Sequence, residues 1–349
     1  MAKALQARGH EIRMAGRPDS KFLKTFEQAG FEGIALSMKG RSFFSNVRKL
    51  RHYVKTQRPD IVIAERNKDI RLAGPALKLT PEIPLIARTG LPSIKNVWRY
   101  RLIYPKLLDG IVVPTEAIKA RYRTYGWINP DIIEVIQDGI EPVNNGEIDG
   151  AAVKAEIKIP ADKKVVGIFS SLNKKKQHNI FLETAARILQ NNPEVVFLVV
   201  GDGPERENIQ KYAYELGIMD QLYMTGFQED TQPLYAICDV VLLTSLEEGL
   251  PHTTMEAMMM EKPVVAFNVG ALSELIETGK SGILVPPNDI FLLTQNTEEL
   301  LMDPDYAARI GREARKRIED NFKMETMLTR FETYLEQKIS EKRGKENVT

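Results

Sequence analysis

Residues 239–256 read "DVVLLTSLEEGLPHTTME", and this stretch decides the fold. Its first part is a largely apolar run, which is typical of a strand buried on both faces of a parallel sheet. Gly249 then allows a close turn, and Pro251 suits the first turn of a following helix. Two carboxylates, Glu248 and Glu256, lie on either side of this turn. A strand that runs through a tight turn into a helix is the unit of a doubly wound α/β domain.

The same unit recurs along the whole chain. We expect twelve short strands, six in each half, at residues 11–16, 33–36, 60–65, 84–89, 110–115, 132–137, 165–172, 194–201, 222–226, 239–245, 262–268 and 282–287. Helix-type segments separate them, and a length of 349 residues suits two domains better than one. The sequence therefore predicts an α/β protein with two doubly wound, Rossmann-like domains that face each other across a cleft.

The turn-rich stretch "GIEPVNNGEIDGAA" separates the two halves. We expect a first domain at residues 1–143 and a second at 144–320. Residues 321–349 are expected to form a C-terminal helix that packs back on the first domain and ends in a frayed tail.

Composition narrows the class of protein. The chain is 43% hydrophobic and 27% charged, and it has no apolar run of about 18 residues that could span a membrane. Its N-terminus has no apolar core of a signal peptide, so we expect a cytoplasmic protein. Cys238 is the only cysteine, which excludes an intrachain disulfide and a cysteine-based metal site.

The charge is unevenly distributed along the chain. Residues 1–140 hold 25 Lys and Arg against 13 Asp and Glu, whereas the remainder holds 23 against 34. A basic half favours anionic partners such as phosphates or lipid head groups. The alternative is a solvated surface with no partner.

The turn after residue 245 offers binding chemistry. The N–H groups of His252, Thr253 and Thr254 open a helix, where a diphosphate would be stabilised. A carboxylate would repel that diphosphate, so Glu248 is expected to bind sugar hydroxyls instead. Glu256 lies deeper and can accept hydrogen bonds from a ribose diol. The alternative is that both are ordinary acids near a helix N-terminus.

Other strand ends of the second half carry Gly, Lys or Glu side chains. The quoted stretches are "SSLNKKKQH", "VVGDGPE", "MTGFQED" and "NVGALSE". Each is weak alone, because a lysine run is usually a solvated face. Because strand ends of one parallel sheet meet at one edge, five such loops together predict a single ligand site.

Residues 165–290 resemble the donor-binding domain of the family-4 retaining glycosyltransferases of GT-B fold. The order "KQH … GDGP … GF … TS..EGLP … EAM … PVVA" is similar to that family, and the spacing of Glu248 and Glu256 fits it. Residues 104–141 resemble the end of the acceptor domain. The resemblance implies transfer of a sugar from a nucleotide-diphosphate sugar to a glycan or lipid-linked acceptor, with retention and without a metal or other cofactor. It also implies cell-surface polysaccharide or lipopolysaccharide-type synthesis, with no nucleic acid partner.

The resemblance implies a role for each matching residue. Lys176 resembles the lysine that neutralises the leaving diphosphate, and Glu248 resembles the glutamate that meets the donor sugar. Glu256 resembles the ribose-binding glutamate. The expected donor site comprises Ser171, Lys175, Gly201, Gly203, Gly226, Phe227, Ser245, Gly249, Leu250, His252, Thr253, Glu256, Gly270 and Glu274, with Glu248 and Lys176 as catalytic residues.

The sequence departs from the family pattern at several positions. Ser171 stands where an arginine is frequent, Ala271 replaces a second glycine, and Asp138 stands where asparagine is usual. The loop "RTGLPSIKNVWRYR" lacks the histidine of many acceptor domains. Its polar candidates for acceptor binding are Arg88, Lys95, Asn96 and Arg99.

The chain begins within what resembles the first helix of the fold, without the first strand and its Gly-rich loop. That strand is central in a doubly wound sheet, so its loss would leave unpaired edges. We therefore expect a truncated chain that binds donor but transfers poorly, with a first half less stable than the second.

Two alternatives to a transferase remain. One is a non-catalytic relative that binds a nucleotide sugar, and the other is a nucleotide-sugar epimerase of similar architecture. Donor hydrolysis separates them from an enzyme that transfers sugar.

The basic residues of the first half concentrate at 39–58, with Phe43 and Phe44 among them. We expect this segment to approach an anionic membrane that carries a lipid-linked acceptor, so that the protein is peripheral on the inner face of the plasma membrane. The alternative is an ordinary helix surface.

Overall fold

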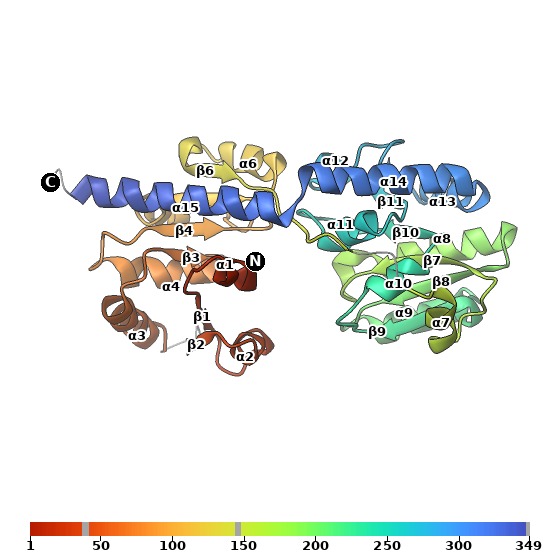
Figure 1. The fold of residues 1–349 in the computed structure, drawn as a ribbon, viewed down its shortest axis with the longest axis horizontal. Coiled ribbons are helices and arrows are strands. Elements are labelled where there is room, and N and C mark those ends of the chain that lie inside the picture. The colour runs from red at the N-terminus through yellow and green to blue at the C-terminus, as the bar shows by residue number, and fades with distance from the viewer. Residues whose placement is uncertain (37–41, 144–147, 347–349) are drawn as a thin grey trace. The chain divides into compact units, whose positions relative to one another are not determined.

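The computed structural model describes residues 1–36, 42–143 and 148–346, and the chain forms two compact units (Figure 1). Unit 1 comprises Met1–Asp138 together with Met324–Thr349, and unit 2 comprises Gly139–Lys323. The first boundary therefore follows Asp138, where the sequence suggested 143, and the second follows Lys323, where it suggested 320.

All twelve predicted strands are present. Those of unit 2 form one parallel sheet in the order β12-β11-β10-β7-β8-β9. The strands are β7 (Lys164–Phe169), β8 (Val195–Val200), β9 (Leu222–Gly226), β10 (Val240–Leu243), β11 (Val264–Phe267) and β12 (Ile283–Val285). Chain order reverses between β7 and β10, and open parallel sheets bind ligands beyond the strand ends at such a reversal.

Helices cover both faces of this sheet, as the buried apolar strands require (Figure 1). They are α7 (Gly150–Glu156), α8 (His178–Asn191), α9 (Arg206–Glu215), α10 (Gln232–Ala236), α11 (His252–Met259), α12 (Leu272–Leu275), α13 (Ile290–Met302) and α14 (Pro304–Asn321). Side-chain caps set several of their starts. Asp149, Asp289 and Asp303 each accept a hydrogen bond from a backbone N–H in the first turn that follows.

The strands of unit 1 form two separate parallel sheets. One pairs β1 (Arg13–Gly16) with β2 (Glu32–Ala35). The other has the order β3 (Val62–Ala64), β4 (Leu85–Arg88), β5 (Gly110–Val113) and β6 (Ile133–Val135). Within the described residues no ladder joins β1 to β3. The strands of the first half are thus divided between a two-stranded and a four-stranded sheet.

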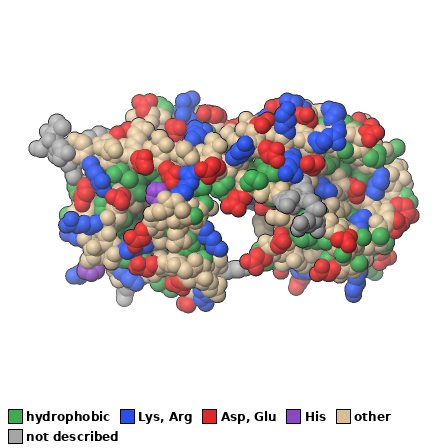
Figure 2. Space-filling model, in the orientation of Figure 1, with side chains coloured by type: hydrophobic (Ala, Val, Ile, Leu, Met, Phe, Trp, Pro, Cys, Tyr) green, Lys and Arg blue, Asp and Glu red, His purple; other side chains and the backbone are tan. Residues whose placement is uncertain are grey.

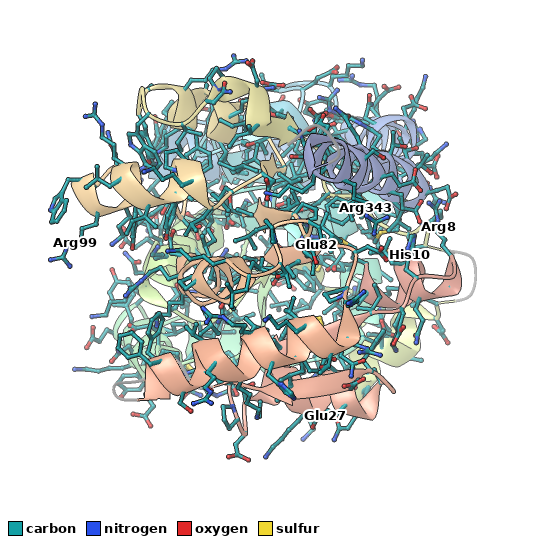
Figure 3. All side chains as sticks on the ribbon, turned by 90° about the vertical axis from the view of Figure 1, so that its left-hand side faces the viewer. Arg8, His10, Glu27, Glu82, Arg99 and Arg343 are labelled. Atoms are coloured by element: carbon teal, nitrogen blue, oxygen red, sulfur yellow. The ribbon has the colours of Figure 1, made fainter. Side chains whose placement is uncertain are left out.

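The helices of unit 1 include the last helix of the chain. They are α1 (Ala2–Ala7), α2 (Lys21–Gln28), α3 (Ser42–Gln57), α4 (Asn67–Leu77), α5 (Trp98–Ile103), α6 (Glu116–Arg123) and α15 (Met324–Glu346). Phe331 and Leu328 of α15 are buried in one cluster with Ile86 and Val112 of the four-stranded sheet. Arg8, which follows α1, pairs with Glu332 of α15, and both Arg8 and His10 lie beside that helix (Figure 3).

Candidate functional site

Two loops at the carboxyl ends of β7 and β10 bring Lys176 and Glu248 together. The Lys176 ammonium lies 2.5 Å from the Glu248 carboxylate, and the Glu248 side chain is only 9% exposed. Thr244 Oγ1 donates a hydrogen bond to the Lys176 carbonyl at 2.8 Å, and the Leu246 N–H donates to the Lys175 carbonyl at 2.9 Å. The pair is therefore fixed by backbone contacts at the point where strand order reverses.

Three of the predicted glycines let these loops pack against one another. Gly201 and Gly270 have φ of +136° and +60°, which are conformations that favour glycine. A Cβ on Gly270 would lie 1.9 Å from the Glu248 carbonyl oxygen, and one on Gly201 would lie 2.0 Å from that of Ser170. A Cβ on Gly203 would lie 2.3 Å from the Leu172 carbonyl oxygen. The absence of a Cβ on Gly270 thus allows the backbone of the loop that carries Glu248 to pack directly against it.

We predict that Gly270→Ala will displace Glu248 and lower activity at least tenfold. Gly279→Ala is the matched control, because Gly279 also has positive φ (+77°) but has no atom near its added Cβ. The control should lose about 1–2 kcal/mol of folding stability, because alanine is unfavourable in the left-handed conformation, and should keep its activity. Thermal unfolding and steady-state rates of both variants test this, and equal activity in the two would contradict it.

Helix α11 begins directly after the Glu248 turn. Pro251 is the N-cap residue of α11 and therefore lies one position before the first helical residue, whereas the sequence had suggested the first turn. Its side chain forms no capping hydrogen bond. Gly249 and Leu250 are buried beside it, and His252 and Thr253 are the first two helical residues. The helix thus points an N-terminus without a side-chain cap at this loop, which favours an anion.

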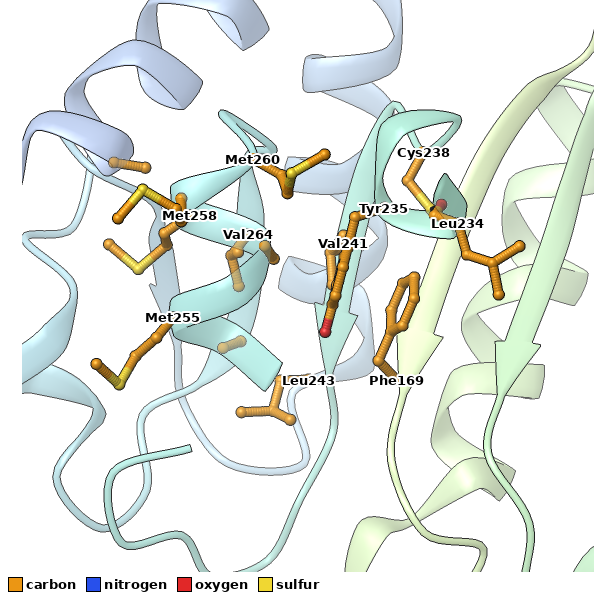
Figure 4. Close-up of a cluster of buried hydrophobic side chains, with 14 of the residues drawn as sticks. Phe169, Leu234, Tyr235, Cys238, Val241, Leu243, Met255, Met258, Met260 and Val264 are labelled. Atoms are coloured by element: carbon orange, nitrogen blue, oxygen red, sulfur yellow. Dashed lines mark hydrogen bonds between the residues drawn. The ribbon is translucent and has the colours of Figure 1, made fainter. Parts of the chain in front are cut away.

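Glu256 lies on α11 and is held by a buried tyrosine. The Tyr235 hydroxyl lies 3.1 Å from Glu256 Oε2 and donates to the Thr253 carbonyl at 2.9 Å, and Thr231 Oγ1 donates to the same carboxylate at 3.5 Å. The Tyr235 ring stacks on Phe169 with 3.7 Å between centroids (Figure 4). Burial raises the pKa of the Glu256 carboxyl and raises that of Tyr235 well above its usual value. These contacts engage one carboxylate oxygen of Glu256.

Unsatisfied polar atoms gather at the same strand ends. Among the described residues of unit 2, the buried side-chain atoms without a hydrogen-bond partner are Gln177 Oε1, His178 Nδ1, Ser245 Oγ and Thr254 Oγ1. Gln177 and Ser245 lie in the segments that follow β7 and β10, His178 opens α8, and Thr254 lies in the first turn of α11. Buried polar groups are normally paired, so these atoms have hydrogen-bonding capacity left for water or a polar ligand. Of the four, the sequence had indicated only Ser245.

Sequence reasoning gave no role to the side chains of Gln177, His178 and Thr254. Gln177 has φ of +47°, a left-handed conformation that is uncommon outside glycine. His178 is buried with Nε2 3.1 Å from Ser170 Oγ, and burial, together with the nearby Lys176 charge, lowers its pKa to about 4. The "KKKQH" run showed the lysines, but its polar neighbours gave no signal of burial.

The other predicted donor residues are more peripheral. Ser171 is exposed and accepts a hydrogen bond from Asn173 at 2.8 Å, and Lys175 is exposed 3.6 Å from Glu247. Gly226 ends β9 with φ of +76°, and Phe227 after it is exposed. Glu274 lies half-buried on α12, where Arg317 binds its backbone carbonyl at 2.8 Å.

The acceptor-side candidates lie in unit 1 and divide into two groups. Arg88 ends β4 and binds Asp138 at 2.5 Å. Lys95, Asn96 and Arg99 are all exposed in the following loop and helix. Asn96 accepts a hydrogen bond from Trp127 Nε1 at 2.8 Å, and the Arg99 guanidinium lies 5.4 Å from the centre of the Trp98 ring.

No group of three His, Cys, Asp or Glu side chains suited to a metal ion occurs in residues 1–36, 42–143 and 148–346. Within the same residues, no helix has the length and apolar character needed to cross a bilayer.

Comparison with known proteins gives the family. Residues 151–317 match the family model described as Glycosyl transferases group 1, and residues 1–143 match that described as Glycosyltransferase Family 4. The lipopolysaccharide core biosynthesis glycosyltransferase LpsE of Rhizobium meliloti is 26% identical over 80% of this chain and 76% of its own length. The chain matches between 34% and 66% of the length of seven further curated relatives.

Solved structures share the fold. A glycosyltransferase from Rickettsia africae superposes with a TM-score of 0.85 at 20% identity, covering 97% of this chain and 93% of its own. Anabaena HepE in complex with UDP and glucose superposes with a TM-score of 0.82 at 22% identity, covering 93% and 91%.

Proposed function

Because this chain belongs to the family-4 glycosyltransferases and has the GT-B fold, we propose that it moves a sugar from a nucleotide-diphosphate sugar to a glycan or lipid-linked acceptor. We further propose that transfer retains the anomeric configuration and uses no metal ion. The observation that carries the proposal is the Lys176–Glu248 pair, fixed at the reversal of strand order beside the N-terminus of α11.

Charge explains why this arrangement suits sugar transfer. When the bond between the sugar and the diphosphate breaks, negative charge develops on the departing diphosphate. The Lys176 ammonium and the N–H groups that open α11 can stabilise that charge, which is the task a metal ion performs elsewhere. The acceptor hydroxyl forms the new bond to the same sugar carbon and gives its proton to the departing diphosphate.

The carboxylates serve the neutral parts of the donor. Glu248 faces Lys176 and is largely buried, so we assign it to the sugar hydroxyls, with Lys176 turning to the diphosphate when donor binds. Glu256 is one turn deeper and has an oxygen free of the Tyr235 contact, so we assign it to the ribose diol.

The relatives support a setting for this reaction. LpsE is named for lipopolysaccharide core biosynthesis, and HepE has been solved with UDP-glucose. We propose that the present chain acts in cell-surface polysaccharide or lipopolysaccharide-type synthesis, and UDP-glucose is the first donor to test.

The function is tested by release of nucleoside diphosphate. The protein is incubated with a panel of nucleotide sugars, after thermal-shift screening for donors that stabilise it. An enzyme should release diphosphate slowly without acceptor and should keep doing so in EDTA. Binding without release would indicate a non-catalytic relative, and interconversion of the free nucleotide sugar would indicate an epimerase. Either outcome would overturn the proposal, and NMR of the product anomer tests retention.

We predict that Glu256→Gln weakens donor binding while kcat changes little. Loss of a charged hydrogen bond costs about 1.5–3 kcal/mol, or roughly ten- to a hundredfold in affinity. Since burial raises the pKa of Glu256, wild-type affinity should begin to fall at a higher pH than for an ordinary glutamate as the solution is acidified.

Calorimetric titration with the donor across pH tests both effects. Glu215→Gln is the control, because Glu215 is an exposed residue of α9 that lies beside Lys211. Unchanged affinity in Glu256→Gln, or the same pH dependence in that variant as in wild type, would remove the ribose assignment.

A further inference from the structure

Helix α5 and its flanks form an exposed surface that is both apolar and basic. Leu91, Val97, Trp98, Leu102 and Ile103 are each at least 40% exposed, and Trp98 reaches 67%. Large apolar side chains that lie together on a surface mark an interaction site, whereas single ones do not. We call residues 91–106 the α5 surface.

Charge identifies the kind of partner. Residues 83–108 contain Arg88, Lys95, Arg99, Arg101 and Lys106 but no Asp or Glu. The last four are exposed on the α5 surface, and the labelled Arg99 points away from the body of unit 1 (Figure 3). Cations beside Trp and Leu side chains fit the interface of an anionic bilayer, where the head groups meet the cations and the acyl boundary takes the apolar side chains.

The α5 surface is held rigidly. Ile94 is fully buried before the helix, and its N–H donates a hydrogen bond to the Tyr122 hydroxyl oxygen at 3.3 Å. Tyr104 is buried after the helix, stacks on Tyr100 with 4.5 Å between centroids, and donates to Asn67 Oδ1 at 3.2 Å. The apolar side chains between these anchors are thus presented to solvent by a fixed support.

The α3 segment that the sequence favoured is less suited to this role. Lys39 and Arg41 lie outside the described residues. Arg51 donates to the Pro75 carbonyl at 2.8 Å and Lys49 to the Ala35 carbonyl at 3.1 Å, so both bind within unit 1. Phe44 is the only exposed large apolar residue of α3. On the face drawn in Figure 2, basic and acidic side chains are interspersed, so no basic patch appears there.

We infer that the α5 surface binds an anionic lipid bilayer and thereby brings the strand ends of unit 1 to a lipid-borne acceptor. The loop that carries this surface starts at the carboxyl end of β4, directly after Arg88. The α5 surface is a membrane contact that the proposed function does not specify. The inference rests on the proposed function only for the nature of the acceptor. Bilayer binding itself needs neither donor nor catalysis.

The test is sedimentation of the full chain with vesicles of phosphatidylcholine alone or with phosphatidylglycerol. Wild type should bind only the anionic vesicles and should be released at high salt. Arg99→Gln/Arg101→Gln should bind roughly 25-fold more weakly, at about fivefold for each charge. Trp98→Ser/Leu102→Ser should lose at least about tenfold, because the buried apolar area is gone.

Matched controls lie in unit 2. Arg309 covers the Tyr306 ring at 5.0 Å, as Arg99 covers Trp98, and Phe291 is as exposed as Trp98. Arg309→Gln and Phe291→Ser should bind vesicles as wild type does. The inference would be overturned if the wild-type protein did not bind anionic vesicles at low salt. It would also be overturned if the α5 variants bound as strongly as wild type while Phe44→Ser/Arg48→Gln lost binding. Diphosphate release from donor in solution should be unchanged in the Trp98→Ser/Leu102→Ser variant, which separates this test from that of the proposed function.

Discussion

Replacing Lys176 by glutamine is expected to lower kcat/KM for sugar transfer by about 10²–10³-fold, the usual cost of removing one group that stabilises developing negative charge. Glutamine keeps most of the side-chain volume and a donor but carries no charge. The loss should appear mainly in kcat, because the diphosphate gains its charge as the bond breaks. Lys211→Gln, on the exposed face of α9, should keep wild-type rates.

A second effect of Lys176→Gln follows from burial. The variant leaves the nearly buried Glu248 carboxylate without its cation, so thermal stability should also fall. Donor binding must therefore be measured at a temperature where the variant is folded. If kcat fell less than threefold in the folded variant, Lys176 would not be the residue that neutralises the diphosphate.

Replacing Glu248 by glutamine is expected to lower kcat by roughly ten- to a hundredfold, in line with the loss of a charged hydrogen bond, with a smaller change in donor affinity. The adjacent Glu247→Gln is the matched control, since Glu247 is 43% exposed and pairs loosely with Lys175 at 3.6 Å. Steady-state rates and donor titrations of both variants test whether kcat falls more than donor affinity. A change in affinity with unchanged kcat would assign Glu248 to ground-state binding.

The double variant Lys176→Gln/Glu248→Gln adds a test of the pair itself. Two side chains 2.5 Å apart should be coupled, so the effects on unfolding free energy should not add. The double variant should be more stable than the sum of the single losses predicts, because neither charge is left alone.

The strands were predictable because a strand that is buried on both faces of a sheet appears in the sequence as a short continuous apolar run. "VVFLVV" at β8 is such a run, and all of its residues are buried. That residues of the candidate site lie close together was also predictable, since strand ends of a parallel sheet meet at one edge. Lys176 and Glu248 are 72 positions apart, yet their places after β7 and β10 were enough to bring them together.

What the sequence could not show depends on packing between loops. Tyr235 was given no role from the sequence, and only the folded chain reveals its hydroxyl at Glu256 and its ring on Phe169. Gly201 and Gly203 were expected to contact a ligand. In the structure, each position requires glycine because a Cβ there would clash with a backbone carbonyl oxygen. The α5 surface was also missed, because a short sequence that mixes apolar and basic residues does not tell which face of the helix is covered.

The place of α15 in unit 1 has a consequence for synthesis of the protein. Residues 1–138 leave the ribosome first, yet Ile86 and Val112 of that segment are covered by Leu328 and Phe331, which are made after all of unit 2. Unit 2 is continuous in the chain and can close its core as it emerges. Ile86 and Val112 of unit 1 therefore lack this cover until α15 has been made. Apolar side chains that stay exposed in a nascent chain favour aggregation, so this interval is the one in which the first half is most exposed to it.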